Sequence, residues 1–127
     1  MKHVLVAEDD GPTRSFLVAA LSDEGYVVSV AVNGKAALER CAELKPDIVV
    51  LDLSMPIVDG IEFLRRRGPE CNAPVVAVSA AFRRDQLREL PIAAFVAKPF
   101  DLHVLIAVIA RSLGSATEER TTAQPLN

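Results

Sequence analysis

The sequence predicts an α/β fold in which helices cover both faces of a parallel β-sheet. Several short runs are rich in aliphatic and β-branched residues, and their continuous apolarity is typical of strands that are buried on both faces. Segments of helical character separate the runs, so that strands and helices alternate along the chain. The runs are Val4 to Ala7, Val27 to Val32, Asp47 to Leu53 and Pro74 to Ala80, with a weaker fifth run from Ala93 to Ala97.

Glycine, proline and asparagine residues mark the ends of the first two predicted helices. The first begins at Gly11-Pro12, because proline loses no hydrogen bond at an early helical position, and it ends before Gly25. The second begins near Asn33-Gly34 and ends before Pro46, whose ring disfavours a helical conformation in the preceding residue. Both helices therefore fill the spaces between predicted strands.

The next two predicted helices are shorter. The third starts after Gly60 and ends by Gly68-Pro69. The fourth covers roughly Arg83 to Leu90, and Pro91 closes it.

The fifth predicted helix closes the folded region. It runs from about Asp101, a suitable N-cap, to Leu113, and Gly114 is placed as its C-terminal end. The polar segment 115–127 offers little to bury, so we expect a flexible tail. One domain over residues 1–114 is therefore predicted, and its signal is expected to leave through its own surface.

Composition and charge narrow the class of protein. Of the 127 residues, 50% are hydrophobic and 24% are charged, which is typical of a folded globular domain and not of a disordered chain. The formal net charge is -3, and no continuous basic surface is evident for a nucleic acid, so we expect no direct DNA binding. Arg65 to Arg67 and Arg83-Arg84 are interpreted as the solvated ends of short helices.

The two cysteines suggest neither a metal site nor a cross-link. Cys41 and Cys71 lie far apart, without a C-x-x-C pairing or nearby histidines, so neither a zinc site nor a disulfide framework is indicated. The N-terminal apolar run is too short for a signal peptide, and no run approaches a membrane span of about 20 residues. We therefore expect a cytoplasmic protein without membrane contact.

Polar residues follow the predicted strands where each of them ends. Glu8-Asp9-Asp10 follows the first strand, Asp52 ends the third, Ser79 the fourth, and Lys98-Pro99 follows the fifth. Open parallel sheets bind ligands beyond the carboxyl ends of their strands. These residues are therefore expected to converge in space.

Three of these acids suit a divalent cation. Glu8, Asp9 and Asp52 would repel one another at close range, and a cation removes that repulsion. Mg²⁺ prefers hard oxygen ligands and typically combines one or two carboxylates with waters and phosphate oxygens. The alternative is that Glu8-Asp9-Asp10 is a set of acids stabilised by the positive end of a helix dipole.

Lys98 and Ser79 are candidate phosphate ligands. Lys98 lies between apolar residues and Pro99, where a charged side chain needs a carboxylate or phosphate partner. Ser79 offers a hydroxyl hydrogen bond to another phosphate oxygen. The alternatives are an ordinary turn for Ser79 and a surface salt bridge for Lys98.

Together these residues resemble the response-regulator receiver family of two-component signalling, along the chain from Lys2 to about Leu113. The resemblance identifies the chain as a single-domain member and implies a flavodoxin-like, doubly wound (βα)5 fold with strand order 2-1-3-4-5. The segments similar to the family's signatures are Val4 to Asp10 with Pro12 and Arg14, Asp47 to Pro56 followed by Asp59-Gly60, Val75 to Ala80, and Lys98-Pro99-Phe100.

The resemblance also implies roles for the acids. Asp52 corresponds to the phosphoacceptor, which takes a phosphoryl group from a histidine kinase or a phosphotransfer protein. Mg²⁺ would be bound by Asp9, Asp52 and the backbone carbonyl of Ser54, and mainly through water by Glu8. Catalysis would extend only to the protein's own phosphorylation and dephosphorylation, so the chain is not expected to be an enzyme in the usual sense.

A second set of residues is implied to bind the phosphoryl group and respond to it. Ser79 and Lys98 would move toward the added charge, and Phe95 would rotate into the space that Ser79 leaves. Phe95 is equally well explained as a core residue. The resemblance further implies that the peptide bond before Pro99 is cis.

Two departures from the family pattern concern the backbone. Ile57 stands where the family often has glycine, so we expect the backbone to avoid positive φ there. The stretch from Ser79 to Lys98 is short, which predicts a reduced fourth helix.

The expected partners are the phosphodonor protein and a downstream protein target. A second apolar stripe on the fifth helix, which includes Val104 and Val108, suggests a homodimer or partner contact through helices four and five. A wide core-facing stripe explains the same residues. Two other functions remain open: a pseudo-receiver that binds proteins without phosphoryl chemistry, and a hydrolase or phosphatase that uses Asp52 as a transient nucleophile.

Overall fold

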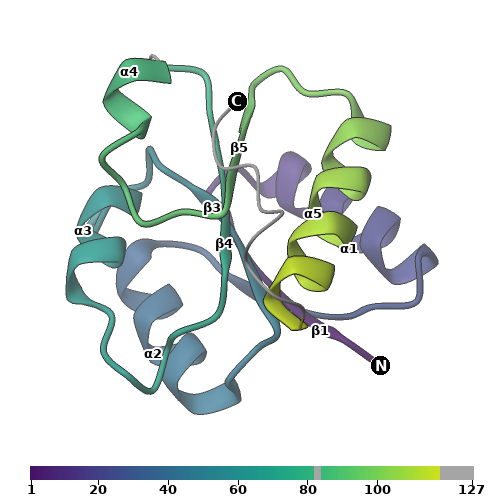
Figure 1. The fold of residues 1–127 in the computed structure, drawn as a ribbon, viewed down its shortest axis with the longest axis horizontal. Helices are drawn as coiled ribbons and strands as arrows, with labels where there is room; N and C mark the ends of the chain where they lie inside the picture. Colours follow the sequence, from purple (N-terminus) through teal and green to yellow (C-terminus); the bar gives the residue numbers. More distant parts are fainter. Residues whose placement is uncertain (82–83, 118–127) are drawn as a thin grey trace.

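In the computed structural model, which describes residues 1–81 and 84–117, the strands form one sheet in the order β2-β1-β3-β4-β5, with every neighbouring pair parallel (Figure 1). This confirms the predicted fold class and strand order. The strands are β1 (His3–Ala7), β2 (Val27–Ala31), β3 (Ile48–Asp52), β4 (Val75–Ser79) and β5 (Ala94–Ala97).

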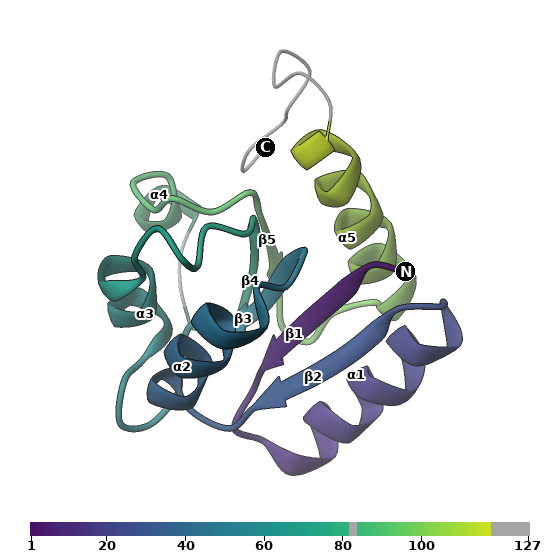
Figure 2. The same ribbon diagram turned by 90° about the horizontal axis from the view of Figure 1, so that it is seen from below.

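Helices cover the sheet on both faces (Figures 1 and 2). On one face lie α1 (Gly11–Asp23) and α5 (Leu102–Thr117), and on the other lie α2 (Gly34–Leu44), α3 (Gly60–Arg66) and α4 (Arg84–Leu87). None of the helices within the described ranges combines the length and apolarity that a membrane crossing requires.

The central strands contribute side chains to two separate cores. In β3, Ile48 and Val50 pack with α1 and α5, whereas Val49 and Leu51 pack with α2 and α3. Successive side chains of a strand point to opposite faces, so a strand that is covered on both sides must be apolar at every position. This explains the continuous apolar runs in the sequence.

Short polar side chains begin the helices, as the sequence predicts for Asp101. The carboxylates of Asp10 and Asp59 and the amide oxygen of Asn33 accept hydrogen bonds from backbone N–H groups in the first turns of α1, α3 and α2. Asp101 does the same for α5, since its Oδ1 accepts from the N–H of His103 at 2.8 Å. Each cap satisfies a donor that has no partner inside its helix.

The end of the fifth helix differs from the prediction. The helix continues through Gly114 to Thr117, so the predicted stop at Gly114 is wrong. A glycine inside a helix is only about 1 kcal/mol less favourable than an alanine. The packing of Leu105, Ile109 and Leu113 against the sheet outweighs this cost. The predicted tail beyond Thr117 and the predicted start of the fourth helix at Arg83 lie outside the described residues.

The fourth helix is short, as predicted. Within the described part of this stretch the helix covers Arg84–Leu87 and so ends before the predicted Leu90, and Leu87 is fully buried in the core that α2 and α3 share. This helix is therefore held by few apolar contacts.

A disulfide joins Cys41 of α2 to Cys71 in the segment between α3 and β4, so the prediction that no disulfide forms is wrong. Their Cα atoms lie 5.2 Å apart although 30 residues separate them in sequence. No sequence pattern indicates this pair, because the two cysteines come together only through the packing of α2 beside α3. Closing a loop of this length contributes about 3 to 4 kcal/mol to stability in the chain-entropy account.

The basic cluster at the end of α3 is only partly solvated. Arg65 and Arg66 are exposed and pair with Glu62, as expected of a helix end. Arg67 is half-buried, which lowers its pKa, and its Nη1 donates to the carbonyl of Ala73 at 2.7 Å. Arg67 therefore fixes the segment that carries Cys71.

Two glycines allow a matched test of the packing. A Cβ at Gly34 would lie 1.8 Å from the carbonyl oxygen of Val58, whereas a Cβ at Gly114 meets nothing within 4 Å. We expect Gly34→Ala to lower the free energy of unfolding by about 1 to 3 kcal/mol through overpacking. Gly114→Ala should raise it by about 0.5 to 1 kcal/mol because alanine favours the helix. Urea unfolding measures the free energy of unfolding of both variants. The same change in both would contradict the described contacts.

Candidate functional site

The candidate site lies at the carboxyl ends of four strands. Glu8 and Asp9 follow β1, Asp52 ends β3, Ser79 ends β4, and Lys98 follows β5. Backbone hydrogen bonds hold neighbouring strand ends together. For example, the N–H of Lys98 donates to the carbonyl of Ser79 at 2.9 Å. The sheet therefore brings together the residues that the sequence predicted to converge.

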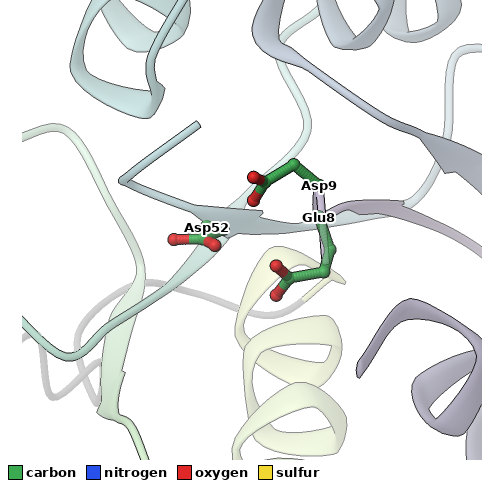
Figure 3. A group of neighbouring side chains, drawn as sticks. All are labelled: Glu8, Asp9 and Asp52. Atoms are coloured by element: carbon green, nitrogen blue, oxygen red, sulfur yellow. The ribbon is translucent and has the colours of Figure 1, made fainter. Parts of the chain in front are cut away.

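Three carboxylates lie close together and point toward one another (Figure 3). Glu8, Asp9 and Asp52 each contribute one oxygen to a group in which all these atoms lie within 4.8 Å of one another. Glu8 is only 1% exposed and Asp52 4%, whereas Asp9 is exposed. This set of hard oxygen donors fits a small divalent cation that also keeps water ligands.

Lys98 connects the two buried carboxylates. Its Nζ donates to Glu8 Oε1 at 2.9 Å and to Asp52 Oδ2 at 3.1 Å. Leaving a buried charge without a partner is costly, and this lysine gives both carboxylates a partner of opposite charge. The prediction that Lys98 needs a carboxylate partner is confirmed.

The pKa values reflect this arrangement. Burial raises the pKa of Glu8 above its ordinary value, and nearby Asp52 adds to the rise although the Lys98 hydrogen bond opposes it. Burial lowers the pKa of Lys98, but its hydrogen bonds to Glu8 and Asp52 prevail and hold that pKa above the ordinary value. Lys98 therefore remains protonated at neutral pH, and Glu8 carries an unfavourable charge.

The three consecutive acids divide between two roles. Glu8 and Asp9 belong to the carboxylate group, whereas Asp10 caps α1, so the helix-terminus interpretation holds for Asp10. Arg14 supports the backbone here, because its Nη1 donates to the carbonyls of Glu8 at 2.9 Å and Asp9 at 3.3 Å. No sequence pattern predicts this contact, apart from the presence of an arginine in the first turns of α1.

The segment that follows Asp52 is held by backbone contacts. Asp52 Oδ1 accepts from the N–H of Ser54 at 2.9 Å, and the N–H of Gly60 donates to the carbonyl of Leu53 at 3.1 Å. Ile57 has a φ of 71°, so the expectation that it avoids positive φ is wrong. A β-branched residue in this region is strained by about 1 to 3 kcal/mol, and the closure of the loop between β3 and α3 imposes that conformation.

The remaining predicted residues lie beside this group. Ser79 is buried, and its Oγ accepts from the N–H of Ala81 at 3.1 Å. Phe95 is half-buried and packs against the core on the α2 and α3 side, as the core interpretation expects. The Lys98–Pro99 peptide bond is cis, as the resemblance implied.

Comparison with known proteins gives matches along most of the chain. The family model described as "Response regulator receiver domain" matches residues 4–110. The response regulator receiver protein CpdR of Brucella abortus is 38% identical over 120 residues, which cover 91% of this chain and 100% of CpdR. The transcriptional regulatory protein PdtaR of Mycobacterium tuberculosis is 36% identical over 112 residues, which cover 85% of this chain and 55% of PdtaR.

A solved structure agrees with the sequence matches. The receiver domain of the Francisella response regulator 1452 has a TM-score of 0.85 and 28% identity, covering 92% of this chain and 100% of that one. The chain spans about half the length of several of the curated relatives that it matches, PdtaR among them.

Substitution of Glu8 tests the electrostatics of the carboxylate group. Glu8→Gln keeps an acceptor for Lys98 but removes a buried charge, so we expect a higher unfolding temperature in the presence of a chelator. The same variant should gain less stability from added Mg²⁺ than the wild type gains. Thermal unfolding under both conditions measures this, with Glu39→Gln on the exposed side of α2 as the control. A lower unfolding temperature in chelator would contradict the described electrostatics.

Proposed function

The chain belongs to the response regulator receiver domain family, and on this premise we propose that it accepts a phosphoryl group on Asp52 and signals through the conformational change that follows. One observation carries the proposal. Asp52 lies buried at the end of β3, 3.1 Å from the Lys98 ammonium and beside two further carboxylates. Such a group combines a nucleophile with the positive charge that a phosphoryl group needs.

The proposed donor is a phosphohistidine on a histidine kinase or phosphotransfer protein. A carboxylate oxygen of Asp52 attacks the phosphorus, the P–N bond breaks, and the histidine nitrogen keeps the electron pair. The chain catalyses only its own phosphorylation and dephosphorylation. We place this reaction in the cytoplasm, which is typical of the family.

The proposed cofactor is Mg²⁺, held by Glu8, Asp9, Asp52 and the backbone carbonyl of Ser54. When bound, the cation offsets negative charge on the transferring phosphoryl group. Lys98, which follows β5, adds a second positive charge. Arg14 holds the backbone carbonyls of Glu8 and Asp9 and so fixes where their carboxylates begin.

The proposed switch follows from the charge that phosphorylation adds, roughly 1.5 to 2 negative charges at neutral pH. Lys98 exchanges its carboxylate partners for a phosphoryl oxygen. Ser79 gives up its local contact with the N–H of Ala81 to donate to another oxygen. Phe95, on the neighbouring strand, then turns inward, and the two arrangements exist as an equilibrium that phosphorylation shifts.

We further propose that α5 contributes a contact to a second copy of the chain. Val104 is 50% exposed and Ala107 is exposed, whereas Leu105 and Ile109 on the same helix are buried in the core. Val108 packs partly against that core, so the second apolar stripe of α5 divides between the two roles. The other helix of the expected contact, α4, spans Arg84–Leu87.

Phosphorylation of Asp52 can be tested by intact mass after incubation with acetyl phosphate and Mg²⁺. We expect the wild type to gain the mass of one phosphoryl group and Asp52→Asn to gain none. Asp59→Asn is the matched control, because asparagine caps α3 as well as aspartate does. Failure to phosphorylate with either acetyl phosphate or a kinase would favour a pseudo-receiver, and turnover without an adduct would favour a phosphatase.

The contact through α5 can be tested by the oligomeric state of the phosphorylated protein. Val104→Glu should shift the protein from dimer to monomer, because the substitution places a charge in an apolar contact. Ala110→Glu, at an exposed position of α5 outside the stripe of Val104 and Val108, should leave the oligomeric state unchanged. Light scattering after size-exclusion chromatography measures both, and a monomeric wild type would contradict the proposed dimer.

A further inference from the structure

The Cys41–Cys71 disulfide lies at the opposite end of the molecule from the carboxylate group. Cys41 is in the last turns of α2, and Cys71 precedes β4, so both lie near the amino ends of the central strands. The two helices that it affects, α2 and α3, lie side by side in both ribbon views (Figures 1 and 2). The disulfide therefore joins α2 to the segment that immediately follows α3.

The opposite ends of the same two helices contact the segment that follows Asp52. Gly34, at the start of α2, contacts the backbone of Val58 so closely that a Cβ would lie 1.8 Å from its carbonyl oxygen. Gly60, at the start of α3, approaches Leu53, where a Cβ would lie 2.5 Å from the Cα atom. Both ends of residues 53–59 thus contact the first residues of α2, which carries Cys41, and of α3, which the segment with Cys71 follows.

Both cysteines of the disulfide are buried, Cys71 slightly less completely than Cys41. Cys71 is 3% exposed and Cys41 0%. Both line a surface hollow of about 270 Å³, and Cys71 also lines a neighbouring hollow of about 260 Å³. A small thiol that enters these hollows would therefore meet the side of the disulfide that Cys71 contributes.

The charges around these hollows favour an incoming thiolate. Lys45 lines the first hollow, and Arg66 and Arg67 line the second, against one acid, Glu70, which lines both. Positive charge stabilises the thiolate, which is the form that attacks a disulfide.

We propose that Cys41–Cys71 is a site of reversible thiol–disulfide exchange, and that its state sets how firmly α2 and α3 hold the segment 53–59. The effect on phosphorylation rests on the proposed function of Asp52. Disulfides in a reducing cytoplasm are usually transient or redox-sensing, so a buried pair in a protein that acts there is expected to open and close.

Reduction of the disulfide consumes two external thiols. A thiolate attacks Cys71 Sγ, the bond between the two sulfurs breaks, and Cys41 leaves as a thiolate that takes up a proton. A second thiol attacks the mixed disulfide and releases Cys71 as a thiol. The two external thiols are oxidised to a disulfide, and the reverse reaction with such a disulfide closes the cross-link.

Opening the cross-link removes a restraint on the α2–α3 pair. Residues 53–59 hold the strained Ile57 conformation, which is maintained only while its surroundings impose it. The reduced protein is therefore expected to show a more mobile segment 53–59 and several-fold slower phosphorylation, since Asp52 is less well positioned.

Hydrogen exchange measured by mass spectrometry tests the structural part. Wild-type protein is first oxidised with glutathione disulfide, and one half is then reduced with dithiothreitol under native conditions. We expect the reduced half to accept two alkyl groups at its cysteines and to exchange several-fold faster in 53–59. Exchange in α5, which lies on the opposite face of the sheet, serves as the internal reference for global loosening.

A variant without the cross-link controls for the reductant. In Cys41→Ala/Cys71→Ala, dithiothreitol should change neither the rate of hydrogen exchange nor the rate of phosphorylation. Failure of the wild type to form the disulfide, reduction that requires denaturant, or equal exchange in 53–59 for both forms would each overturn the proposal. The proposal would also be overturned if reduction raised the hydrogen-exchange rate in α5 as much as in residues 53–59.

Phosphorylation by acetyl phosphate is measured on the same two samples. A slower rate in the reduced sample supports the link to Asp52, and equal rates contradict it. No adduct in either sample contradicts the proposed function of Asp52, while the exchange data still decide whether the disulfide controls the segment 53–59. The two failures are therefore distinguishable.

Discussion

The contact of Lys98 with Glu8 and Asp52 is the interaction on which the site depends. The carboxyl ends of parallel strands lie together at one end of the sheet, and two of the side chains there are buried carboxylates. Two buried carboxylates at this distance repel each other, and a buried charge is costly unless it has a partner of opposite charge. The lysine supplies that partner at 2.9 and 3.1 Å, and it comes from the strand at the far edge of the sheet.

This arrangement ties the site to the register of the whole sheet. The backbone bond from Lys98 to Ser79 fixes β5 against β4, and bonds along β4 and β3 continue the alignment to Asp52. A charge introduced at Asp52 therefore acts on residues from several strands at once. Such a group is suited to a two-state response, since its members cannot each adjust alone.

The α2 and α3 side of the sheet restrains the same site by a different means. Two glycines allow close backbone contact with the segment after Asp52, and the Cys41–Cys71 bond joins the far end of α2 to the segment that follows α3. Ile57 adopts a left-handed conformation within that segment. The strain is tolerated because both ends of the segment are fixed by helices that are themselves packed on the core.

The sequence by itself determined the features that depend on local patterns. Apolar runs of the right length predicted the strands, and Asp10, Asn33, Asp59 and Asp101 begin their helices because their side chains bond to neighbouring N–H groups. Because strand ends meet at one edge of a parallel sheet, the convergence of Glu8, Asp9, Asp52 and Lys98 also followed from order along the chain.

Only the tertiary structure decided the features that depend on distant neighbours. The pairing of Cys41 with Cys71 needs α2 beside α3, and the continuation of α5 through Gly114 is favoured by packing that outweighs a weak local preference. The positive φ of Ile57 follows from closing a loop between two fixed elements, against the residue's own preference. In each case the deciding energy comes from contacts between segments that no local pattern encodes.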